Sequence, residues 1–268
     1  MKTSKAAAQS ADFKMEYFES HAHYDDRRFR EDREELLKEL LPSSGVSHII
    51  NIGCDVKSSE MSVRMADKYD YIYAAVGVHP HELYDMSSQT IEKLRKLSEH
   101  KKVVAIGEIG LDYHYDTHPR EFQRFWFIQQ LRLAEETGLP VVIHSREASQ
   151  DTFDIIERSK VRRGSIHCYS GSAEMAKDYV KMGFHIGVGG VVTFPNAKKL
   201  VEVVEAIPIE SILIETDCPY LAPAPNRGKR NDSSNLKYIV EKIAEIKGLT
   251  PEKVAEITKK NAENLFLK

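Results

Sequence analysis

Eight short apolar runs alternate with longer segments of helical pattern, and this alternation constrains the fold more than any other feature of the sequence. The runs are "MEYFESH", "SHIINIG", "YIYAAVGVH", "KVVAIGEIG", "LPVVIH", "RGSIH", "GFHIGVGG" and "SILIETD". Repeated strand–helix units imply parallel strands joined by right-handed crossovers. Eight units, spaced by about 30 residues, are typical of a closed barrel. We therefore predict an α/β fold, a (β/α)8 TIM barrel.

Two of the intervening segments have recognisable helix ends. The segment 119–138 has Pro119 near its first turn and Gly138 at its end, and the last helix has Thr250 as N-cap and Pro251 as its first residue. A doubly wound open sheet is the alternative architecture. It usually has fewer strands, and it often carries a Gly-rich phosphate loop after the first strand, which this sequence lacks.

Length and composition are compatible with one large domain. The chain has 268 residues, of which 41% are hydrophobic and 29% charged, and this is ordinary for a globular protein. We expect residues 1–14 to be a flexible leader and residues 15–268 to form a single barrel domain. The formal net charge of -3 does not suggest a general nucleic-acid or membrane binder, because such proteins usually present a strongly basic face.

Cysteine usage and hydropathy indicate where the protein works. The chain has three cysteines, and this small, odd number argues against a disulfide framework and favours a reducing compartment. No apolar run approaches the roughly 18 residues that a membrane span requires. We expect a cytoplasmic protein with no membrane partner.

Histidines gather at the ends of the apolar runs. Six of the eleven histidines lie there: His21, His23, His79, His81, His144 and His167. In a (β/α)8 barrel the carboxyl ends of the strands form the active-site face. His21 and His23 are two residues apart, so in a strand their side chains point to the same face. Two imidazoles aimed at one point suit a metal ion better than a packed core.

Carboxylates share these faces. By strand alternation, Glu19 lies on the face of His21, and Glu215 lies on the face of Asp217; Glu108 lies inside the fourth run. We expect these four acids to converge with the histidines at one end of the barrel. Unpaired buried carboxylates would each cost several kcal/mol, and divalent cations remove that cost. A mixed imidazole and carboxylate set suits Zn, Mn or Fe and tolerates Mg.

The candidate metal ligands are therefore His21, His23, Glu108, His144, His167 and Asp217. For His79 and His81 two interpretations stay open, contact with substrate and packing within a loop.

The segments "SHAHYDD", "GEIGLDYH", "LPVVIHSREA", "HCYSGS", "GVGGVVTFPNA" and "ETDCPYLAPAPNRGKRN" together resemble the TatD-type metal-dependent deoxyribonucleases of the amidohydrolase superfamily. The resemblance runs from about Met15 to the end of the chain. It implies a phosphodiester hydrolase that works through a metal-activated water. His21, His23, Glu108 and Asp217 would surround one metal, and Glu108 would bridge to a second one held by His144 and His167. Glu19 stands where the family usually has Asp.

Catalysis and substrate contacts are predicted on this basis. We expect Glu108 and Asp217 to be catalytic, with Asp217 orienting or deprotonating the attacking water. The cofactors would be divalent ions, two of Zn, Mg or Mn. Arg146, and Arg230 in the loop "NRGKRN" that also contains Arg227 and Lys229, are candidates for phosphate contacts. Tyr113 is a candidate for stacking on a base.

The expected substrate is single-stranded DNA, with RNA as a further possibility, degraded from the 3′ to the 5′ end by a monomer. Two rival functions stay open. One is an amidohydrolase acting on acyl esters or amides such as D-aminoacyl-tRNA. The other is a barrel that binds metal or nucleic acid without catalysis. Many amidohydrolases use a carbamylated lysine at the fourth strand, and Glu108 takes that place here.

Overall fold

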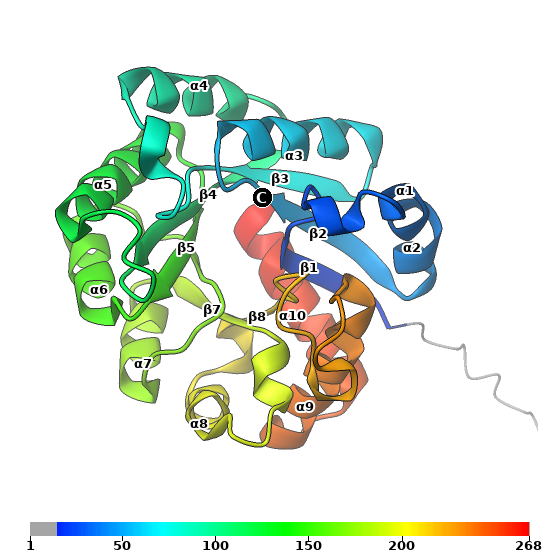
Figure 1. Ribbon diagram of the computed structural model, residues 1–268. Coiled ribbons are helices and arrows are strands. Elements are labelled where there is room, and N and C mark those ends of the chain that lie inside the picture. The colour runs from blue at the N-terminus through cyan, green and yellow to red at the C-terminus, as the bar shows by residue number, and fades with distance from the viewer. Residues whose placement is uncertain (1–14, 268) are drawn as a thin grey trace, which may run out of the picture.

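A computed structural model of the chain describes residues 15–267 and shows a single eight-stranded parallel sheet that curls into a nearly closed barrel (Figure 1). The strands follow each other around the barrel in sequence order, which excludes the doubly wound alternative. Each predicted apolar run forms one strand, so the predicted TIM barrel is confirmed. The strands are β1 Tyr17–Ala22, β2 Val46–Ile52, β3 Ile72–Val76, β4 Val103–Asp112, β5 Val141–Arg146, β6 Gly164–Ile166, β7 Phe184–Val188 and β8 Ile212–Ile214.

The seam between the first and last strands closes just beyond the end of β8. The backbone N–H of Asp217 donates to the carbonyl of His21 at 3.0 Å, and the N–H of His23 donates to the carbonyl of Cys218 at 2.9 Å. Ala22 and Cys218 form a parallel bridge between these two bonds. Residues from the two ends of the chain therefore meet at the carboxyl ends of the strands.

The helices form an outer ring around the sheet (Figure 1). A continuous helical segment, residues 33–43, follows β1, and its middle turn is a π-helix, Leu36–Leu40. The α-helices are α1 Arg33–Glu35, α2 Leu41–Ser43, α3 Val56–Lys68, α4 Ser88–Ser98, α5 Arg120–Thr137, α6 Ser149–Arg158, α7 Ala173–Lys181, α8 Lys198–Ala206, α9 Leu236–Lys247 and α10 Pro251–Phe266.

The predicted helix ends are found in α5 and α10. Pro119 is the N-cap of α5, and Gly138 ends the helix with a φ of 70°, a left-handed conformation that glycine adopts at little cost. Thr250 caps α10 by accepting a hydrogen bond from the N–H of Lys253 at 3.3 Å, and Pro251 is the first helical residue. The sequence pattern thus located both helices.

Two hydrophobic cores hold the barrel together. The larger one lies between the sheet and the surrounding helices. The smaller one fills the barrel interior with side chains such as Phe18, Ile50 and Leu213, and the end of α10 adds Leu265 and Phe266 to it. These packed layers leave the functional site to the opposite, carboxyl end of the strands.

The predictions of no membrane partner and of a flexible leader are only partly open to examination in the described residues. None of the helices within residues 15–267 is long and apolar enough to cross a membrane. The predicted leader, residues 1–14, lies outside the described residues.

Candidate metal centre

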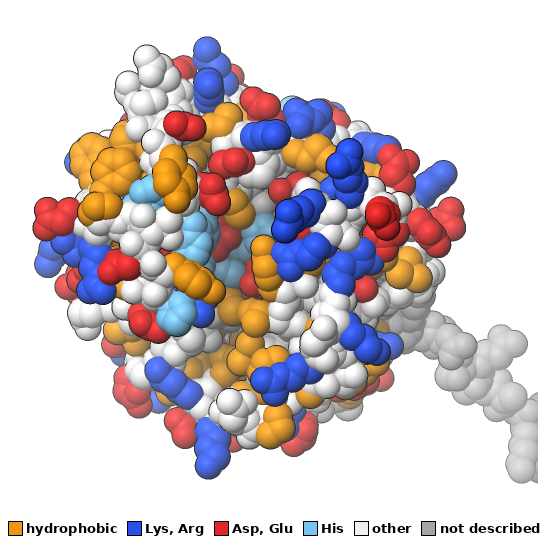
Figure 2. Space-filling model, viewed as in Figure 1, with side chains coloured by type: hydrophobic (Ala, Val, Ile, Leu, Met, Phe, Trp, Pro, Cys, Tyr) orange, Lys and Arg blue, Asp and Glu red, His pale blue; other side chains and the backbone are white. Residues whose placement is uncertain are grey.

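A cavity of about 800 Å³ opens at the carboxyl ends of the strands, and histidine side chains lie at its floor (Figure 2). Its position is the one that barrel enzymes use for catalysis. The cavity is lined by His23, Asp25, Asp26, Cys54, Asp55, Ser58, His79, His81, Glu82, Glu108, Asp112, Tyr115, His144, Arg146, His167, Asp217, Tyr220 and Leu221.

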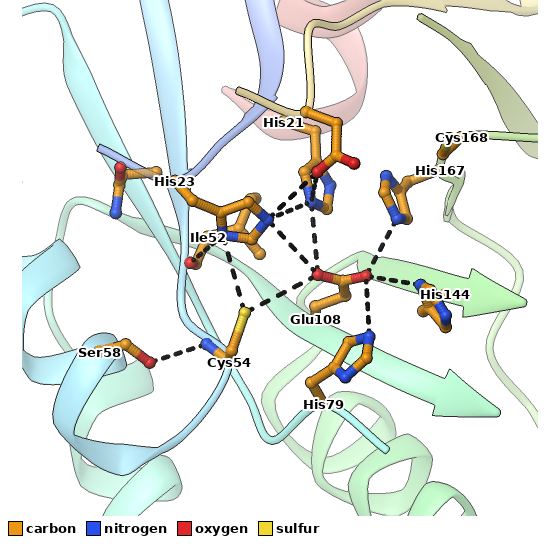
Figure 3. Close-up of polar contacts among 12 residues, drawn as sticks. His21, His23, Ile52, Cys54, Ser58, His79, Glu108, His144, His167 and Cys168 are labelled. Carbon is orange, nitrogen blue, oxygen red and sulfur yellow. Dashed lines mark hydrogen bonds and ion pairs between the residues drawn. The ribbon is translucent and has the colours of Figure 1, made fainter. Parts of the chain in front are cut away.

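Glu108, on β4, lies in the middle of the histidines, and its two carboxylate oxygens face different ones (Figure 3). The side chain is almost fully buried. Oε2 is 3.4 Å from Nε2 of His21 and 3.8 Å from Nε2 of His23. Oε1 is 3.0 Å from Nδ1 of His144 and 3.0 Å from Nε2 of His167. One carboxylate therefore stands between two sets of possible ligands.

The first set consists of His21, His23, Glu108 and Asp217. Nε2 of His21 is 3.1 Å from Nε2 of His23, so the two imidazoles of β1 and its loop do converge on one point. Oδ1 of Asp217 completes the set, 3.4 Å from Nε2 of His23 and 3.7 Å from Nε2 of His21. Asp217 has a φ of 54°, a strained conformation for a non-glycine residue that is found preferentially at functional sites.

The second set contains Glu108, His144, His167 and also His79, whose Nε2 is 3.6 Å from Oε1 of Glu108. His144 lies near the end of strand β5, and its other ring nitrogen, Nε2, is 3.0 Å from Oδ2 of Asp112. The backbone of Gly110 passes so close that an added Cβ would lie 2.0 Å from the carbonyl oxygen of His144. The glycine therefore allows β4 and β5 to approach.

The charges of the two sets are mutually dependent. Burial by itself would raise the pKa of Glu108, but the surrounding imidazoles of His167, His79 and His21 outweigh it and hold the pKa well below its usual range. Burial would lower the pKa of His167, yet Glu108 and then Glu215 raise it well above the ordinary histidine value. The positive charge of an imidazolium thus compensates the negative charge of Glu108. A divalent cation at this place would supply that positive charge instead.

The residues present fit a divalent metal. The ligand atoms of His21, His23 and Glu108 all lie within 4.8 Å of one another, and so do those of His79, Glu108 and His144. Histidines that bind metal usually donate from their other nitrogen to a carboxylate or carbonyl. Here Nδ1 of His23 lies 3.1 Å from the carbonyl of Ile52, and Nε2 of His144 faces Asp112. The two sets could hold one ion or two.

Glu19 does not join these groups, and its predicted convergence with the other acids is wrong. Its fully buried carboxylate turns towards the chain after β8, where it accepts hydrogen bonds from the N–H of Thr216 at 2.9 Å and from its hydroxyl at 2.6 Å. It also accepts from the backbone N–H of His21 at 3.2 Å. Glu19 therefore fixes the strands that carry two candidate ligands.

Glu215 supports the second set from behind. Oε1 of Glu215 lies 3.5 Å from Nδ1 of His167 and accepts a hydrogen bond from the N–H of Cys168. The ring of His167 stacks on that of His21, with centroids 3.7 Å apart. Glu215 was predicted to converge with the histidines, and it does lie against one of them, His167.

Of the residues predicted to contact substrate, three line the cavity: His79, His81 and Arg146. Nε2 of His81 lies 3.0 Å from Oδ2 of Asp112. The guanidinium of Arg146 lies 4.9 Å from the centre of the Tyr115 ring. These three residues are placed to contact a molecule in the cavity.

Tyr113 and Arg230 are not among the residues that line the cavity in the described part of the chain, so neither can contact a substrate inside it. The Tyr113 hydroxyl donates to Asp151 at 2.6 Å, and its ring is covered by the guanidinium of Arg120. Arg230 forms an ion pair with Asp32. Both side chains are engaged with partners outside the cavity.

Asp112, Tyr115 and Tyr220 are among the cavity residues that sequence reasoning did not single out as site residues. Asp112 aligns His144 and His81, and its place on the face of Glu108 and Gly110 was a usable signal. Tyr115 and Tyr220 lie in loops beyond the strand ends, where alternation no longer says which way a side chain points. No pattern in the sequence singled them out.

Comparison with known proteins gives a consistent result. The family described as TatD related DNase matches residues 18–267. A protein of Bacillus subtilis, the uncharacterized metal-dependent hydrolase YabD, is 45% identical over 93% of this chain and 98% of its own length. The uncharacterized metal-dependent hydrolase TatD of Mycobacterium tuberculosis is 34% identical over 92% of this chain and 97% of its own.

Solved structures show the same likeness. The crystal structure of YjjV, a TatD homologue from Escherichia coli K12, superposes with a TM-score of 0.89 at 32% identity, over 94% of this chain and 98% of that one. A TatD-family hydrolase from Entamoeba histolytica has a TM-score of 0.84 at 24% identity, over 94% of this chain and 98% of that one. The second likeness concerns the fold alone.

Proposed function

Since the chain belongs to the TatD-related DNase family of metal-dependent hydrolases, we propose that it is a nuclease that removes nucleotides from the 3′ end of single-stranded DNA, with RNA as a second substrate. The observation that carries the proposal is the position of Glu108 between two sets of ligands at the floor of a cavity. A centre at the floor of a cavity suits a flexible strand end better than the interior of a long duplex.

His21, His23, Glu108 and Asp217 would hold one divalent cation, and Glu108, His144 and His167 a second. Bound cations lower the pKa of water and polarise a phosphoryl oxygen. Asp217, which lines the cavity, would orient the attacking water and accept its proton. Its pKa is held below the ordinary value, since hydrogen bonding to His23 and the charges of His167 and His21 outweigh the effect of burial.

Arg146 and His81 would act on the substrate from the cavity wall. The guanidinium of Arg146 can donate two parallel hydrogen bonds to phosphate oxygens, and its stacking on Tyr115 limits its freedom before substrate arrives. His81 is oriented by Asp112. A charge that develops on the phosphoryl group would be stabilised by donors already aimed at it.

We also propose that the protein works in the cytoplasm as a monomer. Cys54, Cys168 and Cys218 are all free thiols, which supports a reducing compartment such as the cytoplasm. Every candidate ligand comes from one chain, which supports a monomer as the working unit.

The proposal is tested with 5′-labelled and 3′-labelled single-stranded DNA in Mg²⁺, Mn²⁺ or Zn²⁺. We expect the 5′-labelled strand to give a ladder that shortens from its 3′ end. Asp217→Asn should lower the rate at least about 100-fold, while Asp70→Asn, at an exposed acid that precedes β3 and lies outside the cavity lining, should leave it unchanged. Absence of cleavage in all three metals, with turnover of D-aminoacyl-tRNA instead, would contradict the nuclease assignment.

A further inference from the structure

Two loops far apart in the sequence form a basic rim beside the cavity. Nη1 of Arg230 donates to the backbone carbonyl of Arg28 at 2.8 Å, which holds the loop after β8 against the loop after β1. Figure 2 shows Lys and Arg side chains beside the histidine-lined hollow. The basic rim consists of exposed side chains of Arg27, Arg28, Arg30, Arg227, Lys229 and Arg230.

Part of this charge is free to bind an anion. Arg28 and Arg230 are engaged with Asp26 and Asp32. In contrast, the side chains of Arg27, Arg30, Arg227 and Lys229 form no ion pair with any residue in the range 15–267. An exposed cation without a partner keeps its full charge for a ligand. Because the whole chain carries a net charge of -3, this local excess does not follow from composition.

The other side of the cavity has the opposite charge. Segments 25–33 and 226–232, which carry the basic rim, contain seven basic and five acidic residues. Segments 54–60 and 79–85, which contribute Asp55 and Glu82 to the cavity lining, contain one lysine and four acids. A polyanion that leaves the cavity is therefore attracted to one side and repelled by the other.

An aromatic side chain connects the cavity to the basic rim. Tyr220 lines the cavity and is 48% exposed, and the guanidinium of Arg28 lies 4.0 Å from the centre of its ring. Asp26 fixes that guanidinium from its edge with hydrogen bonds of 3.0 Å and 2.9 Å. Flat groups of this kind stack with nucleic-acid bases regardless of sequence.

We propose that the basic rim binds the phosphodiester backbone of a single strand where it leaves the cavity, while Tyr220 and Arg28 stack on a base at the cavity wall. This rests on the proposed function, because it takes the strand end to occupy the metal centre. The basic rim then contributes to affinity for strands longer than about four nucleotides and adds nothing for a dinucleotide. The basic rim contacts the phosphodiester backbone and not the bases, so DNA and RNA bind to it with similar affinity.

The test compares two triple variants of the full chain loaded with metal. One, Arg27→Gln/Arg30→Gln/Lys229→Gln, removes three free charges of the basic rim. The control, Lys101→Gln/Lys160→Gln/Lys260→Gln, removes three exposed charges elsewhere. Lys101 and Lys160 precede β4 and β6, at the opposite end of the barrel. Fluorescence anisotropy then measures the Kd for a labelled phosphorothioate 12-mer and for a dinucleotide between 50 and 200 mM salt.

We expect the rim variant to weaken 12-mer binding at least about tenfold at low salt, and to reduce the slope of log Kd against log salt by about 2, since each lost phosphate contact on a single strand contributes about 0.7. The dinucleotide and the control variant should stay within about twofold of wild type. Equal 12-mer binding by the two variants would overturn the role of the basic rim even if the enzyme cleaves DNA. Rim-dependent binding without any cleavage would instead count against the nuclease function alone.

Discussion

Glu108 is the residue on which both ligand sets depend. Its oxygens approach nitrogens of His21, His23, His79, His144 and His167 at 3.4, 3.8, 3.6, 3.0 and 3.0 Å. The strand-end pattern identified Glu108 from the sequence, because a lone acid in an apolar run is costly to bury unless a cation or a hydrogen-bond donor compensates its charge. The split of its two oxygens between different histidines needed the structure.

The Glu19–Thr216 pair gives a prediction at this scale. Burial raises the pKa of Glu19 to about 7 from an ordinary 4.5, although hydrogen bonds from Thr216 oppose the shift. The native carboxyl therefore binds its proton more tightly than the unfolded chain does, so this group lowers stability as the pH rises from about 4.5 to 7. Thr216→Val removes the hydroxyl donor and should cost about 1–3 kcal/mol at pH 8, where Glu19 is ionised.

Urea unfolding at pH 8 and pH 5 measures this effect. The cost of Thr216→Val should be smaller at pH 5, because a protonated Glu19 depends less on the lost donor. Thr216→Ser keeps the hydroxyl and serves as the control. An equal loss at both pH values would show that the hydrogen bond to Glu19 contributes little, and that the bond which the Thr216 hydroxyl accepts from the N–H of Cys218 at 3.2 Å accounts for the cost.

At the scale of elements, substitutions of two glycines test whether the close packing of β4 and β5 positions the candidate ligand His144. In Gly110→Ala the new Cβ would clash with the backbone carbonyl of His144. The φ of Gly110 is 144°, which is a further cost because residues with a Cβ rarely adopt it. We expect β5 to shift, with a loss of at least about 2 kcal/mol in the free energy of unfolding and weaker metal binding, since His144 lies on that strand. Gly138→Ala is the matched control: φ is 70°, and an added Cβ there meets nothing within 4 Å.

Both variants are followed by chemical unfolding and by metal titration against a chelator. Gly138→Ala should cost about 1 kcal/mol and leave metal affinity as in the wild type. If Gly110→Ala bound metal as tightly as Gly138→Ala, the close approach of β4 and β5 would have no role in placing His144.

The elements also show where sequence reasoning succeeded and where it ended. Strand ends were readable because apolar alternation breaks at a polar residue, and this located His144 and His167. Beyond a strand end the rule fails: Tyr113 turns outward to Asp151, while Tyr115 faces the cavity. The ion pair of Arg230 with Asp32 was not predicted, because Asp32 is about 200 residues away in the chain and no local pattern reveals such a pair.

At the scale of the whole molecule, the candidate ligands come from β1, β4, β5, the chain just after β6 and the chain after β8. A bound cation would therefore join both sides of the barrel seam. At a free concentration of about 100 times Kd, such a ligand adds about 2.7 kcal/mol, or roughly 5–10 °C in Tm for a chain of this size. Thermal unfolding with Zn²⁺, Mn²⁺ or a chelator measures the shift.

Glu108→Gln is the control for the metal-dependent shift. It keeps the shape of the side chain but removes the charge that both ligand sets share, so its Tm should no longer respond to added metal. A wild-type Tm that is the same with metal and with chelator would contradict metal binding across the seam.

The seam has a consequence for the time at which the enzyme becomes active. Asp217 bonds to His21 across nearly 200 residues, and a ribosome that adds about 5–20 residues per second needs roughly 10–40 s to make that stretch. Until then one edge of β1 lacks its neighbour, and Asp217 is missing from the site. A growing polypeptide therefore cannot carry out the proposed hydrolysis near its own ribosome before Asp217 has been made.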